Sequence, residues 1–309
     1  MRAYEETVSF CSDGDTVRGV LFLPAWDSPS PALIICHGAM EFKENYFELC
    51  HFLVEKGVAA LALDMHGHGQ SEGERFHVDM RWWVADIRAA IAFLENHPEV
   101  DEHRIGAFGF SSGGTAILEA ALVEPRLRAL ITLDATVRSV LSFPETLVCR
   151  ILITLGGIKR MLTKQDLRLS LAKMVQRRPV ASDPEINRRI LSDWRSIEAY
   201  SSFPFPGAAQ IIFVDTIKRV NRITVPTLVL HGGDDQLDPP QTARLLYDAL
   251  TCEKELYIIP GNGHAGHVDR HKDRVMKLTA AWALKHLARG AKGPDSGLPV
   301  QEPIGARIW

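Results

Sequence analysis

The sequence predicts an α/β fold built on a mostly parallel, doubly wound sheet. Short, wholly apolar runs such as Ala32 to Cys36 alternate with longer runs whose apolar positions recur at helical spacing. This alternation is typical of parallel strands that are connected by helices. Chemically reactive residues follow several of the strands, at the edge where such sheets form their binding sites. The 309 residues suffice for one large domain with an insertion.

The strands can be justified in order from the amino terminus. Two β-like runs flank the turn sequence Ser12-Asp13-Gly14-Asp15, which predicts an antiparallel hairpin. The later runs are mostly apolar, and Ala32 to Cys36 is wholly so, as expected of strands that are buried on both faces. Strands are predicted at residues 7–10, 17–23, 32–36, 58–63, 105–108, 127–133, 227–231 and 256–259.

Helices are predicted between these strands. Apolar side chains recur at intervals of three or four residues from Trp83 to Leu94, and Pro98 follows as a stop signal. The run after residue 289 is rich in Gly and Pro and lacks periodicity, so a loose tail is expected at 289–309. Helices are predicted at residues 46–54, 80–96, 115–122, 241–250 and 269–288.

The composition is that of an ordinary globular protein, with 46% hydrophobic residues, 24% charged residues and a net charge of -3. The five cysteines are scattered and form no C-x-x-C pair, which favours free thiols in a reducing compartment. The first residues form no apolar signal segment, and no uncharged apolar run reaches the roughly 18 residues of a membrane span. We therefore expect a cytoplasmic protein.

The candidate nucleophile is Ser111, in the sequence Gly109-Phe110-Ser111-Ser112-Gly113. An apolar strand precedes this G-x-S-x-G motif and a helix-forming run follows it, which is the structural context that the motif requires. Small flanking residues leave the hydroxyl exposed at a helix N-terminus, where developing negative charge is favoured. Because the motif also occurs by chance, the remainder of the chain has to supply partners for the serine.

A serine hydroxyl needs a base, which is usually histidine because its pKa lies near neutrality. The best candidate is His264, which follows Gly263 in the loop after the predicted strand 256–259. His267 in the same loop is the second candidate.

The base in turn needs a carboxylate that fixes its tautomer. Asp235 is the preferred candidate, in the loop after strand 227–231, and its neighbours Asp234 and Asp238 compete with it. A purely structural interpretation makes Asp238 the cap of the helix that begins near Pro240. Asp134, after another strand, is a different option.

An acyl-transfer intermediate also needs two N–H donors for its oxyanion. The amide of Ser112, which follows the nucleophile, is one expected donor. The other is expected from the loop after Cys36, most simply the amide of Ala39.

These features together resemble the α/β-hydrolase superfamily, and within it the serine hydrolases similar to monoacylglycerol lipase and lysophospholipase. The similarity covers residues 16–288. It implies a nucleophile Ser111, an orienting acid Asp235 and a base His264, in that chain order. The motifs that carry it are His37-Gly38, Asp64 to Gly73, Gly109-x-Ser111-x-Gly113, Gly232-x-x-Asp235 and Gly263-His264.

The resemblance also implies a cap inserted between core strands. Residues 1–134 and 219–288 are expected to form the hydrolase core, and residues 135–218 a helical cap. Residues 135–224 contain 15 Lys or Arg residues against 7 acidic ones, whereas residues 1–134 contain 10 against 21. An apolar, basic cap suits an acyl chain or docking at an anionic membrane, although its apolar side could simply pack on the core and its basic side be solvated.

The expected function is therefore cleavage of a carboxylic ester through an acyl-enzyme, on a small-molecule acyl ester such as an acylglycerol or a lysophospholipid. Thioester hydrolysis or acyl transfer would use the same three residues, and a non-catalytic binding protein on this scaffold is a further alternative. No cofactor or metal is expected, because the His and Asp clusters lack the spacing of a zinc hydrolase. The basic cap has few interleaved aromatic residues, which disfavours nucleic acid.

Overall fold

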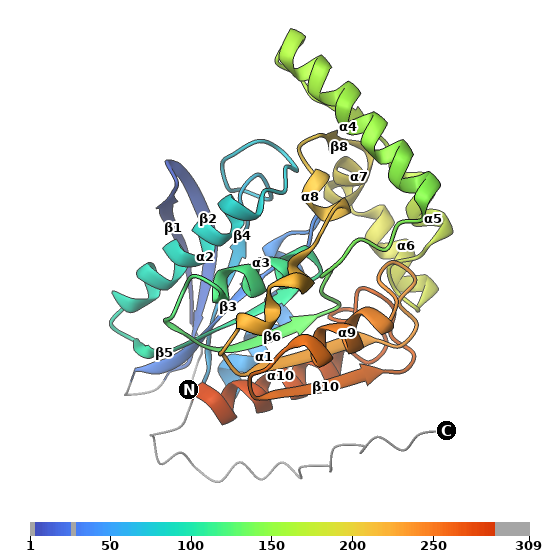
Figure 1. Ribbon diagram of the computed structural model, residues 1–309. Helices are drawn as coiled ribbons and strands as arrows, with labels where there is room; N and C mark the ends of the chain where they lie inside the picture. Colours follow the sequence, from blue (N-terminus) through green and yellow to red (C-terminus); the bar gives the residue numbers. More distant parts are fainter. Residues whose placement is uncertain (1–3, 26–28, 288–309) are drawn as a thin grey trace.

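The computed structural model describes residues 4–25 and 29–287, so the predicted tail at 289–309 lies outside the described residues. A sheet of eight strands in the order β1-β2-β4-β3-β5-β6-β9-β10 forms the centre of the protein (Figure 1). Its strands are β1 Tyr4–Ser12, β2 Asp15–Leu23, β3 Ser30–Cys36, β4 Ala59–Asp64, β5 Val100–Phe110, β6 Leu127–Leu133, β9 Thr227–Gly232 and β10 Lys254–Ile259.

The sheet is parallel from β4 to β10, and among its described strands only β2 runs in the opposite direction. β1 and β2 pair antiparallel through a turn at Asp13 and Gly14, where both residues have positive φ, and β2 pairs antiparallel with β4. All other neighbouring pairs are parallel. The carboxyl ends of β3, β5, β6, β9 and β10 therefore share one edge of the sheet, and the loops that follow these strands meet there.

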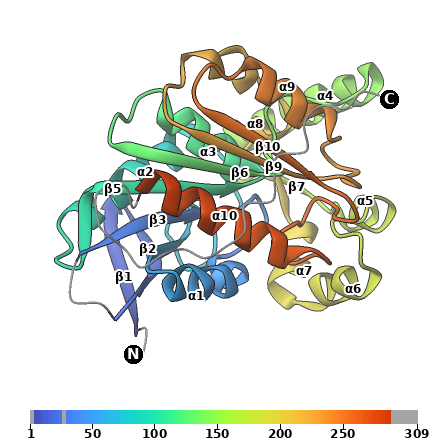
Figure 2. The ribbon, with the colours of Figure 1, turned by 90° about the horizontal axis from the view of Figure 1, so that it is seen from below.

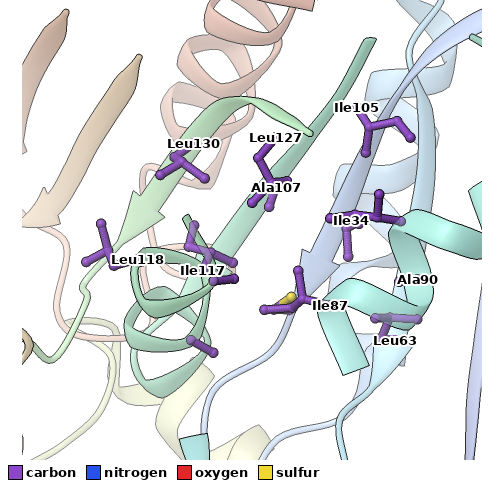
Figure 3. Packing of buried hydrophobic residues seen from close by; sticks show 14 of the residues in the cluster. Ile34, Leu63, Ile87, Ala90, Ile105, Ala107, Ile117, Leu118, Leu127 and Leu130 are labelled. Atoms are coloured by element: carbon purple, nitrogen blue, oxygen red, sulfur yellow. The ribbon is translucent and has the colours of Figure 1, made fainter. Parts of the chain in front are cut away.

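Helices cover both faces of the sheet (Figure 2). One core cluster lies between the sheet and α2, α3 and α9, and Figure 3 shows Ile87 and Ile117 packed against strand residues such as Ile34 and Leu130. A second cluster packs α1 and α10 on the opposite face. The predicted α/β-hydrolase fold is confirmed. These helices are α1 Phe47–Glu55, α2 Met80–Glu95, α3 Ser112–Ala121, α9 Gln241–Ala249 and α10 Lys272–Leu287.

A long segment leaves the sheet after β6 and returns at β9. Its ends are held together, because Ser139 N–H donates to Val214 O at 3.0 Å and Ile217 N–H donates to Val137 O at 3.0 Å. It also contains a short antiparallel β-ladder that the sequence did not predict. Its elements are α4 Phe143–Thr163, β7 Leu167–Leu169, α5 Ala172–Arg177, α6 Pro184–Ser192, α7 Trp194–Ser201, β8 Phe203–Phe205, α8 Ala209–Ile212 and the 3-10 turns Thr216–Lys218 and Val220–Arg222.

The first helix of this segment, α4, projects beyond the rest of the protein (Figure 1). Eight large apolar side chains on it are exposed, and they recur at intervals that place them on one face. The charged residues of α4 do not belong to this apolar set. No helix in the described ranges is long and apolar enough to cross a bilayer. The exposed apolar face of α4 consists of Phe143, Leu147, Val148, Ile151, Leu155, Ile158, Met161 and Leu162.

Candidate active site

Ser111 lies between β5 and α3, at a turn that only small neighbours permit. Its φ of 50° and ψ of -117° lie outside the regions that most residues adopt. A Cβ on Gly113 would lie 2.4 Å from the carbonyl oxygens of Cys36 and His37, and one on Gly109 would lie 2.3 Å from Gly113 O. The glycines of the motif are therefore required for the close approach of β3, β5 and α3.

The structure brings Ser111, His264 and Asp235 into contact at the carboxyl edge of the sheet. Nε2 of His264 lies 3.0 Å from Oγ of Ser111, and Nδ1 of His264 lies 2.7 Å from Oδ2 of Asp235. The other oxygen of Asp235 accepts the backbone N–H groups of Leu237 and Asp238 at 2.8 and 2.9 Å. The carboxylate thus orients the imidazole so that Nε2 can accept a proton from the serine.

The charges of this pair support each other. Burial lowers the pKa of His264, but the Asp235 carboxylate, with Asp238 and Asp134 nearby, outweighs burial and raises it above the ordinary imidazole value. For Asp235, burial raises the pKa, but His264 and His231 outweigh that effect and hold it below the ordinary carboxyl range. Protonation of His264 is therefore favoured while Asp235 stays ionised.

Asp134 and His231 lie behind the pair. Oδ1 of Asp134 accepts the Gly232 N–H at 2.7 Å and its Oδ2 accepts the Gly266 N–H at 3.3 Å, so this buried side chain connects the loops of Asp235 and His264. Burial, more than any other effect, raises the pKa of Asp134. Nε2 of His231 lies 3.3 Å from Oδ2 of Asp235. His231 was not among the sequence-based candidates, although it lies near the end of β9 and only four residues before Asp235, a spacing that could have indicated the contact.

Asp134, His231 and Asp235 together have the residue types and proximity of a metal site. The carboxylate oxygens of both aspartates, however, already accept hydrogen bonds from backbone N–H groups or from His264. A metal ion would have to displace these bonds, so the cluster fits a hydrogen-bonded network better than a metal site.

The residues that competed with Asp235 and His264 for the roles of acid and base make other contacts. Asp234 is exposed. Asp238 is buried and accepts the Thr136 hydroxyl at 2.6 Å, and the N-cap position of α9 is occupied by Pro240, so the interpretation of Asp238 as a helix cap is wrong. His267 is turned toward Glu41, with Nε2 3.3 Å from Oε1.

The two expected oxyanion donors face the same cavity as Ser111. Ala39 lies in the turn Gly38 to Glu41, which the Glu41 N–H closes by donating to Gly38 O at 3.3 Å. Ser112 is the first residue of α3. Within the described part of the chain, neither amide donates a backbone hydrogen bond, as expected of the first residue of a helix and of the second residue of a β-turn. Both residues line the cavity.

This cavity has a volume of about 550 Å³ and extends from Ser111 into the segment between β6 and β9. Its walls are mostly apolar, and arginines stand at its exposed rim. A space of this size and character is typical of sites for apolar small molecules. Apolar residues that line it include Met40, Val140, Leu171, Val175, Phe203 and Phe205.

The fold and the arrangement of strand-end residues define the protein as an α/β hydrolase. Residues 27–271 match the Hydrolase_4 family, described as serine aminopeptidase, S33, and the chain belongs to this family.

Individual relatives agree with this assignment. The chain is 25% identical over 281 residues to an uncharacterized 31.7 kDa protein of Escherichia coli, covering 86% of this chain and 94% of that protein. It is 25% identical over 264 residues to a monoacylglycerol lipase of Mycolicibacterium smegmatis, covering 84% and 90%. An α/β hydrolase from Penicillium sp. sh18 has a similar structure, with a TM-score of 0.75, 21% identity and coverage of 92% and 99%. The chain is thus an α/β hydrolase of the esterase and lipase type, as the sequence predicted.

Proposed function

We propose that the protein is a serine hydrolase that cleaves carboxylic esters with medium or long acyl chains through an acyl-enzyme intermediate. The carrying observation is the 3.0 Å contact of Ser111 Oγ with His264, which is itself 2.7 Å from Asp235, beside a largely apolar cavity of about 550 Å³. The cavity gives the acyl chain a place to lie, and the three side chains give the serine its reactivity.

In the proposed reaction His264 removes the hydroxyl proton of Ser111 as Oγ attacks the ester carbonyl carbon. The oxyanion that forms is bound by the N–H groups of Ala39 and Ser112. His264 then gives its proton to the leaving alcohol, and the acyl group remains on Ser111. A water molecule, deprotonated by His264, attacks the acyl-enzyme and releases the carboxylic acid. No cofactor takes part in these steps.

A panel of p-nitrophenyl esters from acetate to palmitate tests the substrate class. We expect kcat/KM to rise by about tenfold or more from the two-carbon acyl group to a medium-length one, because each buried methylene contributes about 0.8 kcal/mol. Replacement of Val175, which is buried in the cavity wall, by Trp should shorten the preferred chain. A flat chain-length profile, or faster cleavage of aminoacyl anilides than of any ester, would contradict the proposal. Thioesters and an added acceptor alcohol, included in the same assay, separate ester hydrolysis from its two competitors.

We further propose that residues 135–218 act as the cap of this site and contact anionic membranes through α4. The support is the exposed apolar face of α4 described above, together with the excess of basic residues in this part of the chain. Such apolar faces are uncommon on proteins without a partner surface, and basic residues near them attract anionic lipids. Cys149 of α4 lines the cavity, so a docked cap would hold the opening near the lipid.

Flotation with phosphatidylglycerol vesicles measures this contact. We expect Leu155→Glu combined with Ile158→Glu to weaken vesicle binding by roughly tenfold or more, because two charges would have to enter the apolar layer. The matched control is Leu245→Glu, an exposed leucine of similar kind on α9, outside the cap, which should bind as the wild type does. Equal binding of both variants would refute the membrane proposal. A dimer that the α4 substitutions dissociate would mark this face as a contact between two copies.

A further inference from the structure

A largely buried polar bridge joins the loop after β3 to the loop that carries His264. At its centre is Glu41, whose Oε2 accepts a hydrogen bond from the Tyr46 hydroxyl and whose Oε1 lies 3.3 Å from Nε2 of His267. Tyr46 belongs to the 3-10 turn Lys43–Tyr46 that precedes α1, and His267 follows His264 by three residues. The bridge therefore connects segments that are more than 200 residues apart in the chain.

One end of the bridge fixes the turn that contains Ala39. The N–H of Glu41 closes this turn on Gly38, so the position of Glu41 sets the path of Ala39 and Met40 between them. Met40 has a φ of 65°, in the left-handed region that residues other than glycine rarely adopt. Backbone in such a conformation persists only where its surroundings hold it. The side-chain contacts of Glu41 are adjacent to this strained residue and can supply that hold.

The other end reaches the loop of the base. The His267 ring stacks on Tyr46, with ring centroids 4.5 Å apart and an interplanar angle of 11°. His267 also packs on Phe110 at 4.7 Å, and Phe110 lies 5.1 Å from the ring of His264. A continuous set of contacts thus runs from the Ala39 turn to His264.

The electrostatics of Glu41 agree with a paired, ionised carboxylate. Burial raises its pKa, but His267 and the Tyr46 hydroxyl outweigh burial and lower it below the ordinary value. Burial also raises the pKa of Tyr46 well above that of a free phenol, so its hydroxyl stays a donor to Glu41. Removing a carboxylate from water is costly unless such partners are present, and Glu41 lies largely shielded in the wall of an otherwise mostly apolar cavity.

We infer that Glu41, held by Tyr46 and His267, is a positioning residue that fixes the Ala39 amide relative to Ser111 and His264. The inference rests on the proposed function, because it assumes an oxyanion that the Ala39 N–H binds. Such a donor is effective only when it is held close to the developing charge. A small displacement therefore reduces the stabilisation of the transition state more than it reduces the binding of the substrate. The bridge keeps the donor turn and the base loop at a constant separation.

The test compares Glu41→Gln and Tyr46→Phe with the wild type on one p-nitrophenyl ester. We expect kcat to fall about a hundredfold in Glu41→Gln, at the lower end of the range for loss of an oxyanion donor. In Tyr46→Phe, where the carboxylate remains, we expect a smaller loss of about tenfold, and KM should stay within about twofold in both variants. Affinity for an alkyl boronic acid should fall by similar factors, since its tetrahedral adduct with Ser111 places an oxygen at the oxyanion position. Affinity for the product fatty acid should not change.

Matched controls exist on β10, where the Tyr257 hydroxyl donates to Glu255 at 3.0 Å. Tyr257→Phe and Glu255→Gln remove the same kind of bond away from the site, and both should retain wild-type kcat. Wild-type kcat and boronate affinity in Tyr46→Phe and Glu41→Gln would overturn the inference, as would a raised KM at unchanged kcat, which would make Glu41 a substrate-binding residue. If Glu41→Gln does not fold, Tyr46→Phe decides alone. Failure of the proposed function would instead be visible in the wild type, as absence of ester cleavage.

Discussion

Replacing Ser111 with alanine is expected to lower kcat for ester cleavage by roughly 10⁵-fold, because no other group in the proposed mechanism can form the acyl-enzyme. The variant should still fold. Among residues 4–25 and 29–287, Oγ has a single side-chain hydrogen-bond partner, His264, so its loss should change the free energy of unfolding by about 1 kcal/mol or less. Steady-state hydrolysis of p-nitrophenyl esters measures kcat, and thermal unfolding measures the change in stability.

Covalent labelling tests whether Oγ of Ser111 is the nucleophilic atom. A fluorophosphonate probe should label the wild type once and leave Ser111→Ala unlabelled, whereas the exposed Ser201→Ala should be labelled and active like the wild type. Turnover in Ser111→Ala at the wild-type rate would exclude Ser111 as the nucleophile, and with it the proposed mechanism.

Replacing Asp235 with asparagine is expected to lower kcat by about 10⁴-fold, because the imidazole loses the carboxylate that fixes its tautomer and stabilises its protonated form. The pH profile should also change. The reaction needs neutral His264, and Asp235 raises the pKa of this residue, so wild-type kcat/KM should increase with pH through a value above the roughly 6.5 of free imidazole. In the variant the effect of burial on His264 is no longer outweighed by Asp235, which lowers the pKa of the imidazole. The rise of kcat/KM with pH should therefore occur at lower pH than in the wild type.

Asp234→Asn is the matched control, since it removes the neighbouring carboxylate, which is exposed. Its kcat and its pH profile should match those of the wild type. Two results would contradict the role proposed for Asp235. One is a larger loss of kcat in Asp234→Asn than in Asp235→Asn, and the other is a pH dependence of kcat/KM in Asp235→Asn that matches the wild type.

The local features of this protein were predictable because a few residues determine each of them. The glycines around Ser111 predict the turn between β5 and α3, since no side chain fits there, and the apolar runs predict the strands of the sheet. The edge to which the loops converge follows from parallel strands alone. Strand ends were less certain, and β5 begins at Val100, five residues before the predicted run.

Contacts between distant segments were not predictable in the same way. Sequence alone favoured Asp235 but left Asp134, Asp234 and Asp238 as alternatives, and only the folded structure shows which carboxylate contacts His264. Glu41 was not identified because its partner His267 comes from a distant loop. His231 was overlooked although Asp235 is only four residues away. The apolar run of α4 was recognised in the sequence, but whether it packs on the core or is exposed was left open, because both arrangements give the same periodicity.

The two backbone hydrogen bonds that hold the ends of the segment after β6 together have a consequence for how such proteins diversify. Because Ser139 and Val214 are joined directly, everything between them departs from and comes back to one point on the sheet. A shorter, longer or unrelated stretch could be grafted at this junction while the strands that carry Ser111 and Asp235 stay in register. Changes in which molecules are accepted can therefore accumulate in one exchangeable module, separately from the reaction itself.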